Sequence, residues 1–239
     1  MSDMKDVVAV GLDLKPSTLV SAYSQGVFPW PCEDLPLLWH CPMKRGVLLF
    51  EDFHYSRRLK QYIQKAPWHF TVNKAFDQVI TLSQDRGIEG TWITPEMKDA
   101  YRELHRLGHT HSVEVWNGKN LVGGLYGVDI AGYFAGESMF FREDNASKAA
   151  ILFVISLLKK VGRTWMDIQM VTPHMVQLGA CEVTRKKFLS MLAKATEAQK
   201  LGSGLKPFTH EDIQERYVYS DFSMLMEKES SSAIKNTLV

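Results

Sequence analysis

Several features that mark common protein classes are missing from this chain of 239 residues. Cysteine occurs three times, at Cys32, Cys41 and Cys181, without a Cys-x-x-Cys pair, which predicts reduced thiols in a cytoplasmic protein. No apolar run approaches the roughly 18 residues of a membrane span, and the first residues do not have the pattern of a signal peptide. The net charge of +1 gives no indication of nucleic-acid binding through overall charge.

Motifs with a recognisable catalytic or metal-binding spacing are also absent. The sequence has no glycine-rich phosphate loop, no His-Glu-x-x-His motif and no Gly-x-Ser-x-Gly elbow. His105, His109 and His111 lie close together, but no acid accompanies them at ligand spacing, so we interpret them as residues at a helix end. We therefore expect no metal site and no resident cofactor.

The composition is that of a globular domain, with 45% hydrophobic and 23% charged residues. A short, aromatic-rich first part has a helix after Lys15 that ends at Gly26. Two further helices are predicted to begin after caps, one at Asn73 and one at Thr94, which Pro95 follows. A meander of strands follows, with its first turn predicted at Asn117-Gly118. Strands and helices then alternate, and the periodicity weakens after about Lys206. This order predicts an α+β (mixed α/β) fold.

One predicted strand, residues 164–170, has two polar side chains in an otherwise apolar segment. Asp167 and Gln169 are two residues apart, so they point to the same side of the strand. A buried carboxylate costs several kcal/mol unless it is paired, so something must bind Asp167. Asp167 either caps a helix, pairs with an arginine, or belongs to a functional site. Glu137 is a second acid in a strand that we expect to be buried.

Aromatic and basic residues leave two further alternatives open. Trp30, Trp39 and Trp92 lie on predicted loops or loop–helix junctions, where they either fill the core or stack on a base. A helix predicted from His54 to Tyr62, with the residues just after it, presents a cluster of cations, which is either a solvated face or a contact for phosphates. The cluster consists of Arg57, Arg58, Lys60 and Lys65.

Nine short motifs, in this order along the chain, closely resemble those of the leucyl/phenylalanyl-tRNA–protein transferases. They occupy residues 26–30, 39–42, 90–94, 111–116, 121–128, 136–140, 145–148, 167–169 and 178–180. The resemblance implies a small N-terminal domain, residues 1–43, and a larger domain like the N-acetyltransferase superfamily, residues 44–213. A tail, residues 214–239, would follow.

The resemblance also implies an activity. Such enzymes move Leu or Phe from an aminoacyl-tRNA to the N-terminal Arg or Lys of a protein, and so create an N-degron for regulated proteolysis. The implied partners are Leu-tRNA or Phe-tRNA and acceptor proteins with a basic N-terminus, with no membrane contact. We expect the enzyme to act as a monomer.

Individual residues acquire roles through the same resemblance. Gln169 is expected near the attacking α-amine and the aminoacyl carbonyl, oriented by Asp167, and Glu137 is expected to bind the acceptor. The implied substrate-binding residues surround the terminal adenosine (Tyr23, Trp39, Trp92) or form the amino-acid side-chain pocket (Leu125, Phe134, Met139). Arg57, Arg58 and Lys60 become expected contacts for the tRNA backbone.

Two other functions remain as alternatives. An acyl-CoA-dependent N-acyltransferase with this fold would need a glycine-rich turn for pyrophosphate, whereas residues 141–144 are acidic. A non-catalytic N-degron reader would use Glu137 and Asp167 only to bind a basic N-terminus.

Overall fold

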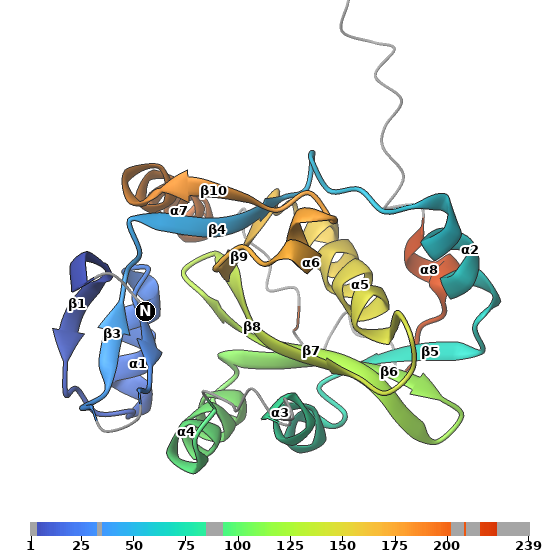
Figure 1. The fold of residues 1–239 in the computed structure, drawn as a ribbon, viewed down its shortest axis with the longest axis horizontal. Helices are drawn as coiled ribbons and strands as arrows, with labels where there is room; N and C mark the ends of the chain where they lie inside the picture. Colours follow the sequence, from blue (N-terminus) through green and yellow to red (C-terminus); the bar gives the residue numbers. More distant parts are fainter. Residues whose placement is uncertain (1–3, 33–34, 85–92, 202–207, 209–215, 224–239) are drawn as a thin grey trace, which may run out of the picture.

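The computed structural model contains two β-sheets of unequal size with helices packed against them (Figure 1). This arrangement confirms the predicted α+β class. The structure describes residues 4–32, 35–84, 93–201, 208 and 216–223. Within these ranges, no helix combines the length and the apolar character that a membrane span requires.

The smaller sheet and one helix form a compact small unit near the N-terminus. Its strands are antiparallel in the order β1-β3-β2, and their bounds are Val7–Val10, Leu38–His40 and Phe28–Trp30. Helix α1, Pro16–Ser24, begins with proline at its first position, where the missing N–H is not needed. It ends just before Gly26, whose φ of 74° suits glycine, as predicted.

The larger sheet has seven strands in the order β10-β4-β9-β8-β7-β6-β5. Their bounds in this order are Cys181–Thr184, Lys44–Leu49, Trp165–Gln169, Tyr133–Phe141, Asn120–Ile130, Thr110–Asn117 and Trp68–Val72. Strands β8 and β9 are parallel, because helix α5, Ala146–Lys160, connects them as a crossover, and the other neighbours are antiparallel. The turn between β6 and β7 is Gly118-Lys119, one residue later than predicted, since Asn117 pairs with Asn120.

Helices cover both faces of this sheet and create two apolar cores. Helices α3 and α4, Phe76–Gln84 and Pro95–Arg106, lie on one face, and α5 lies on the other beside α6, Pro173–Val176 (Figure 1). The predicted cap of α4 is confirmed, because Thr94 Oγ1 accepts the Met97 N–H. Asn73 does not cap α3 as predicted; its side chain accepts the Ser112 N–H instead.

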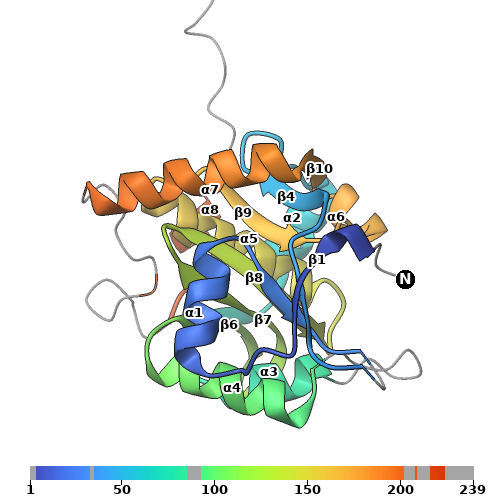
Figure 2. The ribbon, with the colours of Figure 1, turned by 90° about the vertical axis from the view of Figure 1, so that its left-hand side faces the viewer.

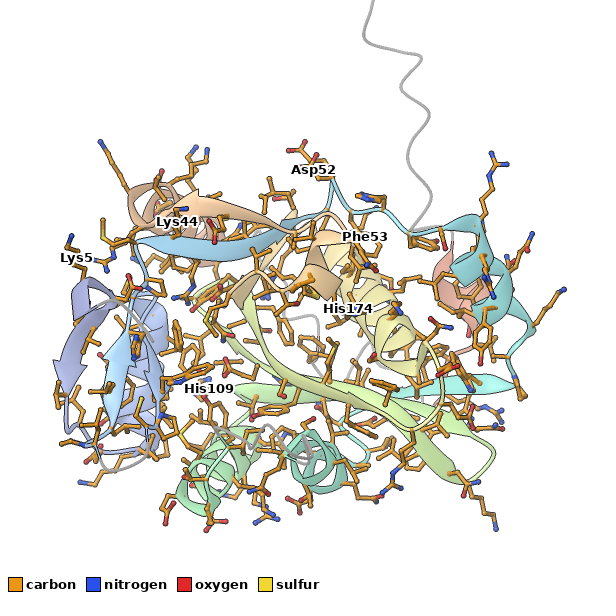
Figure 3. The ribbon with its side chains drawn as sticks, viewed as in Figure 1. Lys5, Lys44, Asp52, Phe53, His109 and His174 are labelled. Atoms are coloured by element: carbon orange, nitrogen blue, oxygen red, sulfur yellow. The ribbon has the colours of Figure 1, made fainter. Side chains whose placement is uncertain are left out.

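Helix α7, Arg185–Lys200, crosses one end of the large sheet and contacts the small unit (Figure 2). Arg185 Nη2 donates to the carbonyl oxygen of Lys5 at 2.7 Å, and Lys5 is labelled in Figure 3. A Cβ on Gly26 would lie 2.6 Å from a ring carbon of Phe188, so glycine permits this close approach. The small unit is therefore fastened to the large sheet through α7.

The C-terminal part of the described chain returns to the body of the protein. Tyr217 forms an antiparallel bridge with Phe70, and α8, Tyr219–Ser223, packs against α5 and against α2, Arg57–Lys65. This part of the predicted tail is thus packed, while residues 224–239 lie outside the described ranges. The large sheet begins at Lys44, and we propose the division into 1–43, 44–213 and 214–239 on that basis.

Candidate active site

A buried ion pair lies where β4 and β9 meet. Arg45 Nε and Nη2 donate to Asp167 Oδ1 and Oδ2 at 2.8 and 2.7 Å, and the two side chains are 1% and 0% exposed. This two-pronged arrangement gives each carboxylate oxygen a charged donor, which a buried carboxylate requires. Asp167 therefore pairs with an arginine, one of the two structural alternatives that the sequence left open.

Asp167 also fixes the backbone two residues further along β9. The Gln169 N–H donates to Asp167 Oδ1 at 3.0 Å, and Gln169 has a φ of 56°, in the left-handed region that residues other than glycine seldom adopt. Such a conformation costs on the order of 1–3 kcal/mol and persists when neighbouring groups enforce it. The carboxylate thus holds Gln169 in a strained conformation at the end of the strand.

Glu137 on β8 is the centre of a second hydrogen-bond cluster. Its Oε1 accepts from Tyr23 Oη at 2.9 Å and from Gln169 Nε2 at 2.8 Å. Its Oε2 accepts from Tyr101 Oη at 3.2 Å, and the oxygens of Tyr23 and Tyr101 lie 2.5 Å apart. The Gln169 amide therefore connects the Glu137 cluster with the Asp167–Arg45 pair.

Burial changes the proton affinity of this cluster. Loss of solvation raises the pKa of Glu137 to about 7, opposed by the hydrogen bond from Tyr23 and assisted by the negative charge of Asp167. Burial likewise raises the pKa of Tyr23 and of Tyr101 well above the usual value, so both remain donors at neutral pH. Glu137 is therefore the group of the cluster that is suited to exchange a proton near neutrality.

The aromatic residues expected around an adenosine lie in different surroundings. Tyr23 is fully buried against Glu137, and Trp39 is fully buried in the core between the small unit and the large sheet. Trp39 therefore packs in this structure, while Trp30, which was not assigned a role, is only partly buried. Trp92 lies outside the described residues, and base contacts by all three predicted residues stay predictions.

The residues expected around the amino-acid side chain do come together. Leu125 on β7 is the register partner of Met139 on β8, and Phe134 is the second residue of the same strand β8. Leu125 and Phe134 belong to one apolar cluster, and Met139 packs against it partly buried. Their grouping on adjacent strands fits an apolar pocket, which remains a prediction.

The predicted basic face is on helix α2. Arg57 and Arg58 are exposed and Lys60 is half-buried, whereas Ser56 caps the helix by accepting the Leu59 N–H. A cavity of about 450 Å³ lies beside Arg58, between α2 and the beginning of α5. The helix begins at Arg57, three residues later than His54, because the Ser56 cap ends the preceding extended segment.

Sequence reasoning missed several buried polar residues. Arg45 stands in the strand-like segment 44–49, where it shares a strand face with the apolar Val47 and Leu49, and this alternation was the signal that could have paired it with Asp167. Tyr101 lies on a helix face among apolar residues and gave no signal of its own. Glu114 on β6 is fully buried, and it accepts from the hydroxyls of Thr71 and Ser112. Burial raises the pKa of Glu114, whose contacts are those of a structural residue.

The cluster around Glu137 is largely closed to solvent, and the described residues do not bring together a set of metal ligands. The residues Glu137 and Gln169 are 8% and 7% exposed, whereas Asp167, Tyr23 and Tyr101 are fully buried. In the described part of the chain, His, Cys, Asp and Glu side chains do not gather in a group of three that suits a metal ion.

Solved structures resemble this fold only distantly. L-PGS from Bacillus licheniformis matches with a TM-score of 0.39 at 11% identity, over 66% of this chain and 52% of that one. A protein of unknown function from Staphylococcus epidermidis matches with a TM-score of 0.41 at 8% identity, over 74% and 68%. Likenesses this weak carry no argument, and the relation to the N-acetyltransferase superfamily stays a prediction.

Sequence comparison is far more specific. A family model described as leucyl/phenylalanyl-tRNA protein transferase matches residues 47–193, and the model of the N-terminal domain of that family matches residues 12–43. The leucyl/phenylalanyl-tRNA–protein transferase of Shewanella denitrificans is 42% identical over 207 residues, or 87% of this chain and 89% of the relative. That of Shewanella baltica is 45% identical over 196 residues, or 81% and 83%. The chain therefore belongs to the leucyl/phenylalanyl-tRNA–protein transferase family.

Proposed function

We propose that this protein transfers Leu or Phe from aminoacyl-tRNA to the N-terminal Arg or Lys of an acceptor protein, which marks that protein for regulated proteolysis. Family membership supports the reaction class. The observation that carries the assignment to a site is the Gln169 amide, which is held between Asp167 on its backbone side and Glu137 on its side-chain side.

The reaction needs little covalent help from the protein. The neutral α-amine of the acceptor attacks the carbonyl carbon of the aminoacyl ester, a C–N bond forms, and the C–O bond to the ribose breaks. A proton leaves the amine and one reaches the departing ribose oxygen. Because the ester is already activated, positioning and charge stabilisation supply most of the acceleration, about 7–11 kcal/mol in favourable cases.

In this proposal Gln169 is the residue that contacts the reacting atoms. Its Nε2 donates to Glu137, which leaves its carbonyl oxygen as an acceptor for an N–H of the attacking amine. An amide is a poor base, so it can only relay the proton: its carbonyl oxygen takes one from the amine while its Nε2 gives one to a stronger base. Glu137, with a pKa of about 7, is next to the amide and can receive it. Asp167 is fully buried and acts by orienting Gln169.

The remaining predicted contacts concern the tRNA and its amino acid. Leu125, Phe134 and Met139 would surround the Leu or Phe side chain. The exposed cations of α2 would meet tRNA phosphates without reading sequence. Tyr23, through its hydroxyl on Glu137, would link the adenosine end to the cluster, and Trp92 would stack on a base.

A non-catalytic reader of basic N-termini is the second candidate. One observation favours it: Glu137 is an acidic residue that is buried but still 8% exposed, and a carboxylate attracts a basic N-terminus. Against it, three donors already occupy both oxygens of Glu137, so few acceptor positions remain for an arginine side chain.

Asp167→Ala separates the two candidates. We expect transfer from Phe-tRNA to a peptide starting with Arg to fall by at least about tenfold, while binding of that peptide is retained. Full transfer activity in the folded variant would contradict the assigned site. Parallel reactions with Leu-, Phe- and Met-tRNA, and with peptides starting with Arg, Lys, Asp or Glu, establish the donor and acceptor preference.

A further inference from the structure

Arg45 connects three parts of the protein that are distant in sequence. Two of its nitrogens bind Asp167 on β9, and the third, Nη1, donates to the carbonyl oxygen of Gly26 in the small unit at 3.1 Å. All the nitrogens of a planar guanidinium are therefore used, which a lysine with its single ammonium cannot reproduce.

The guanidinium is also enclosed by two aromatic rings from different elements. Its central carbon lies 4.6 Å from the ring centroid of Phe28, on β2 of the small unit, and 4.4 Å from that of Phe188, on α7. These are distances at which a cation is attracted to the face of an aromatic ring. The side chain is 1% exposed, so its position is fixed from every side.

We propose that Arg45 is a positioning residue for aminoacyl transfer, which acts on Gln169 through Asp167 while it fastens the small unit to the same strand. The inference rests on the proposed function of Gln169. The path is short and continuous: the guanidinium orients the carboxylate, and the carboxylate accepts the Gln169 N–H. The amide side chain of Gln169 then reaches Glu137.

The conformation of Gln169 explains why such support is needed. At a φ of 56° Gln169 departs from ordinary strand geometry. Without the acceptor at Asp167 Oδ1, its backbone would relax toward the lower-energy strand conformation. A return would turn the amide away from Glu137. A carboxylate that is free to rotate is a poor anchor, and the two bonds from Arg45 prevent that rotation.

A double-mutant cycle in transfer kinetics tests the proposal. Arg45→Lys, Asp167→Asn and the double variant are assayed for transfer from Phe-tRNA to an Arg-starting peptide, with folding checked by circular dichroism. We expect Arg45→Lys to lower kcat by at least about tenfold with KM for Phe-tRNA nearly unchanged. The double variant should be within about twofold of Asp167→Asn, because both changes break one path.

A role in stability alone gives a different outcome, since independent losses in kcat would multiply in the double variant. Multiplying losses, or a folded Arg45→Lys with the wild-type kcat, would overturn the proposal. If a single variant does not fold, Arg45→Met combined with Asp167→Asn replaces it, because no buried charge is then unpaired. Its kcat should lie within about twofold of that of Asp167→Asn, and a further loss of about tenfold, or wild-type kcat, would overturn the proposal.

The same experiment distinguishes this inference from the proposed function. If Asp167→Asn folds and keeps full activity, the assigned site itself is wrong. If Asp167→Asn loses activity while folded Arg45→Lys does not, only the role of Arg45 is wrong.

Discussion

Gln169 and Glu137 form a hydrogen bond of 2.8 Å across the parallel strands β9 and β8. Ala135 of β8 is the register partner of Asp167 of β9, so each of the two side chains stands two residues beyond a paired position and on the same face. The α5 crossover makes this pair parallel. The site thus depends on a topology in which both strands run the same way toward one cluster.

Gln169→Glu is expected to abolish most of the transfer activity. The variant keeps the shape of the side chain, but it loses the donor to Glu137 and places a second carboxyl group at hydrogen-bond distance from it. Two adjacent carboxyl groups hold at most one proton between them, so a negative charge remains, and at pH 8 the hydrogen bond that the amide donated is no longer complete. We expect transfer at pH 8 to fall by about a hundredfold or more relative to the wild type.

The pH dependence of that ratio checks the reason. As the pH falls from 8 to 6, the shared proton is bound more fully and the hydrogen bond between the two side chains is restored. The ratio of variant to wild-type activity should therefore rise. Protonation of the acceptor amine lowers both activities equally, so it does not change this ratio. Gln169→Met, which has no carboxyl group, is the control and should show a constant ratio.

Glu137→Gln is expected to change how stability depends on pH. The folded-state pKa of Glu137 is about 7, above the usual 4.5, so the folded protein binds the proton more tightly than the unfolded chain. Its contribution to stability is complete below pH 4.5 and is lost as the pH rises through 7. That loss amounts to about 3 kcal/mol. Urea unfolding of both proteins at pH 5 and pH 8 measures it: only the wild type should lose this term.

Local sequence patterns predicted several helix starts and ends of this fold, because capping residues and glycines act over a few residues of the chain. Thr94 followed by proline identified the beginning of α4, and Gly26 identified the end of α1. The Asn73 cap was wrong because a long-range partner, the Ser112 N–H, took its side chain. A side-chain cap competes with contacts that only the assembled sheet creates.

The site itself was predicted only in part. The strand patterns identified Asp167, Gln169 and Glu137 as polar residues in buried strands, and the family resemblance added their expected roles. Arg45 and Tyr101 were missed because they come from a strand and a helix that meet the cluster only through tertiary packing. Trp39 is fully buried on a short strand, which fits the core alternative that its residue type left open, while its contact with a base stays a prediction.

Trp39→Ala and Trp92→Ala are expected to act on different properties. The Trp39 ring is enclosed in a core, so its removal should lower the free energy of unfolding by about 3–5 kcal/mol. Trp92→Ala should instead weaken the use of aminoacyl-tRNA, because base stacking contributes about 1–3 kcal/mol per base. Thermal unfolding and KM for Phe-tRNA distinguish them; an unchanged KM in Trp92→Ala would assign that residue to packing.

Gly26→Ala is expected to loosen the attachment of the small unit. The residue has a φ of 74°, and an added Cβ would lie 2.6 Å from the Phe188 ring, so the alanine must shift the carbonyl that Arg45 binds. Limited proteolysis between the small unit and β4 should become faster, and kcat should fall. Gly11→Ala is the matched control, because Gly11 also has a positive φ of 74° but would place its Cβ in open space.

The exposed cations of α2 are expected to make the use of tRNA dependent on salt. Arg57 and Arg58 stand at the surface of that helix, and each phosphate contact releases counterions when it forms. Replacing one of them by alanine should weaken tRNA binding and reduce the slope of log K against log salt by about 1. Arg106→Ala is the matched control: Arg106 is an exposed arginine on α4, where it pairs with Glu103. Filter binding of Phe-tRNA between low and moderate salt measures the slopes. Equal slopes in Arg57→Ala, Arg58→Ala and Arg106→Ala would exclude α2 from the tRNA contact surface.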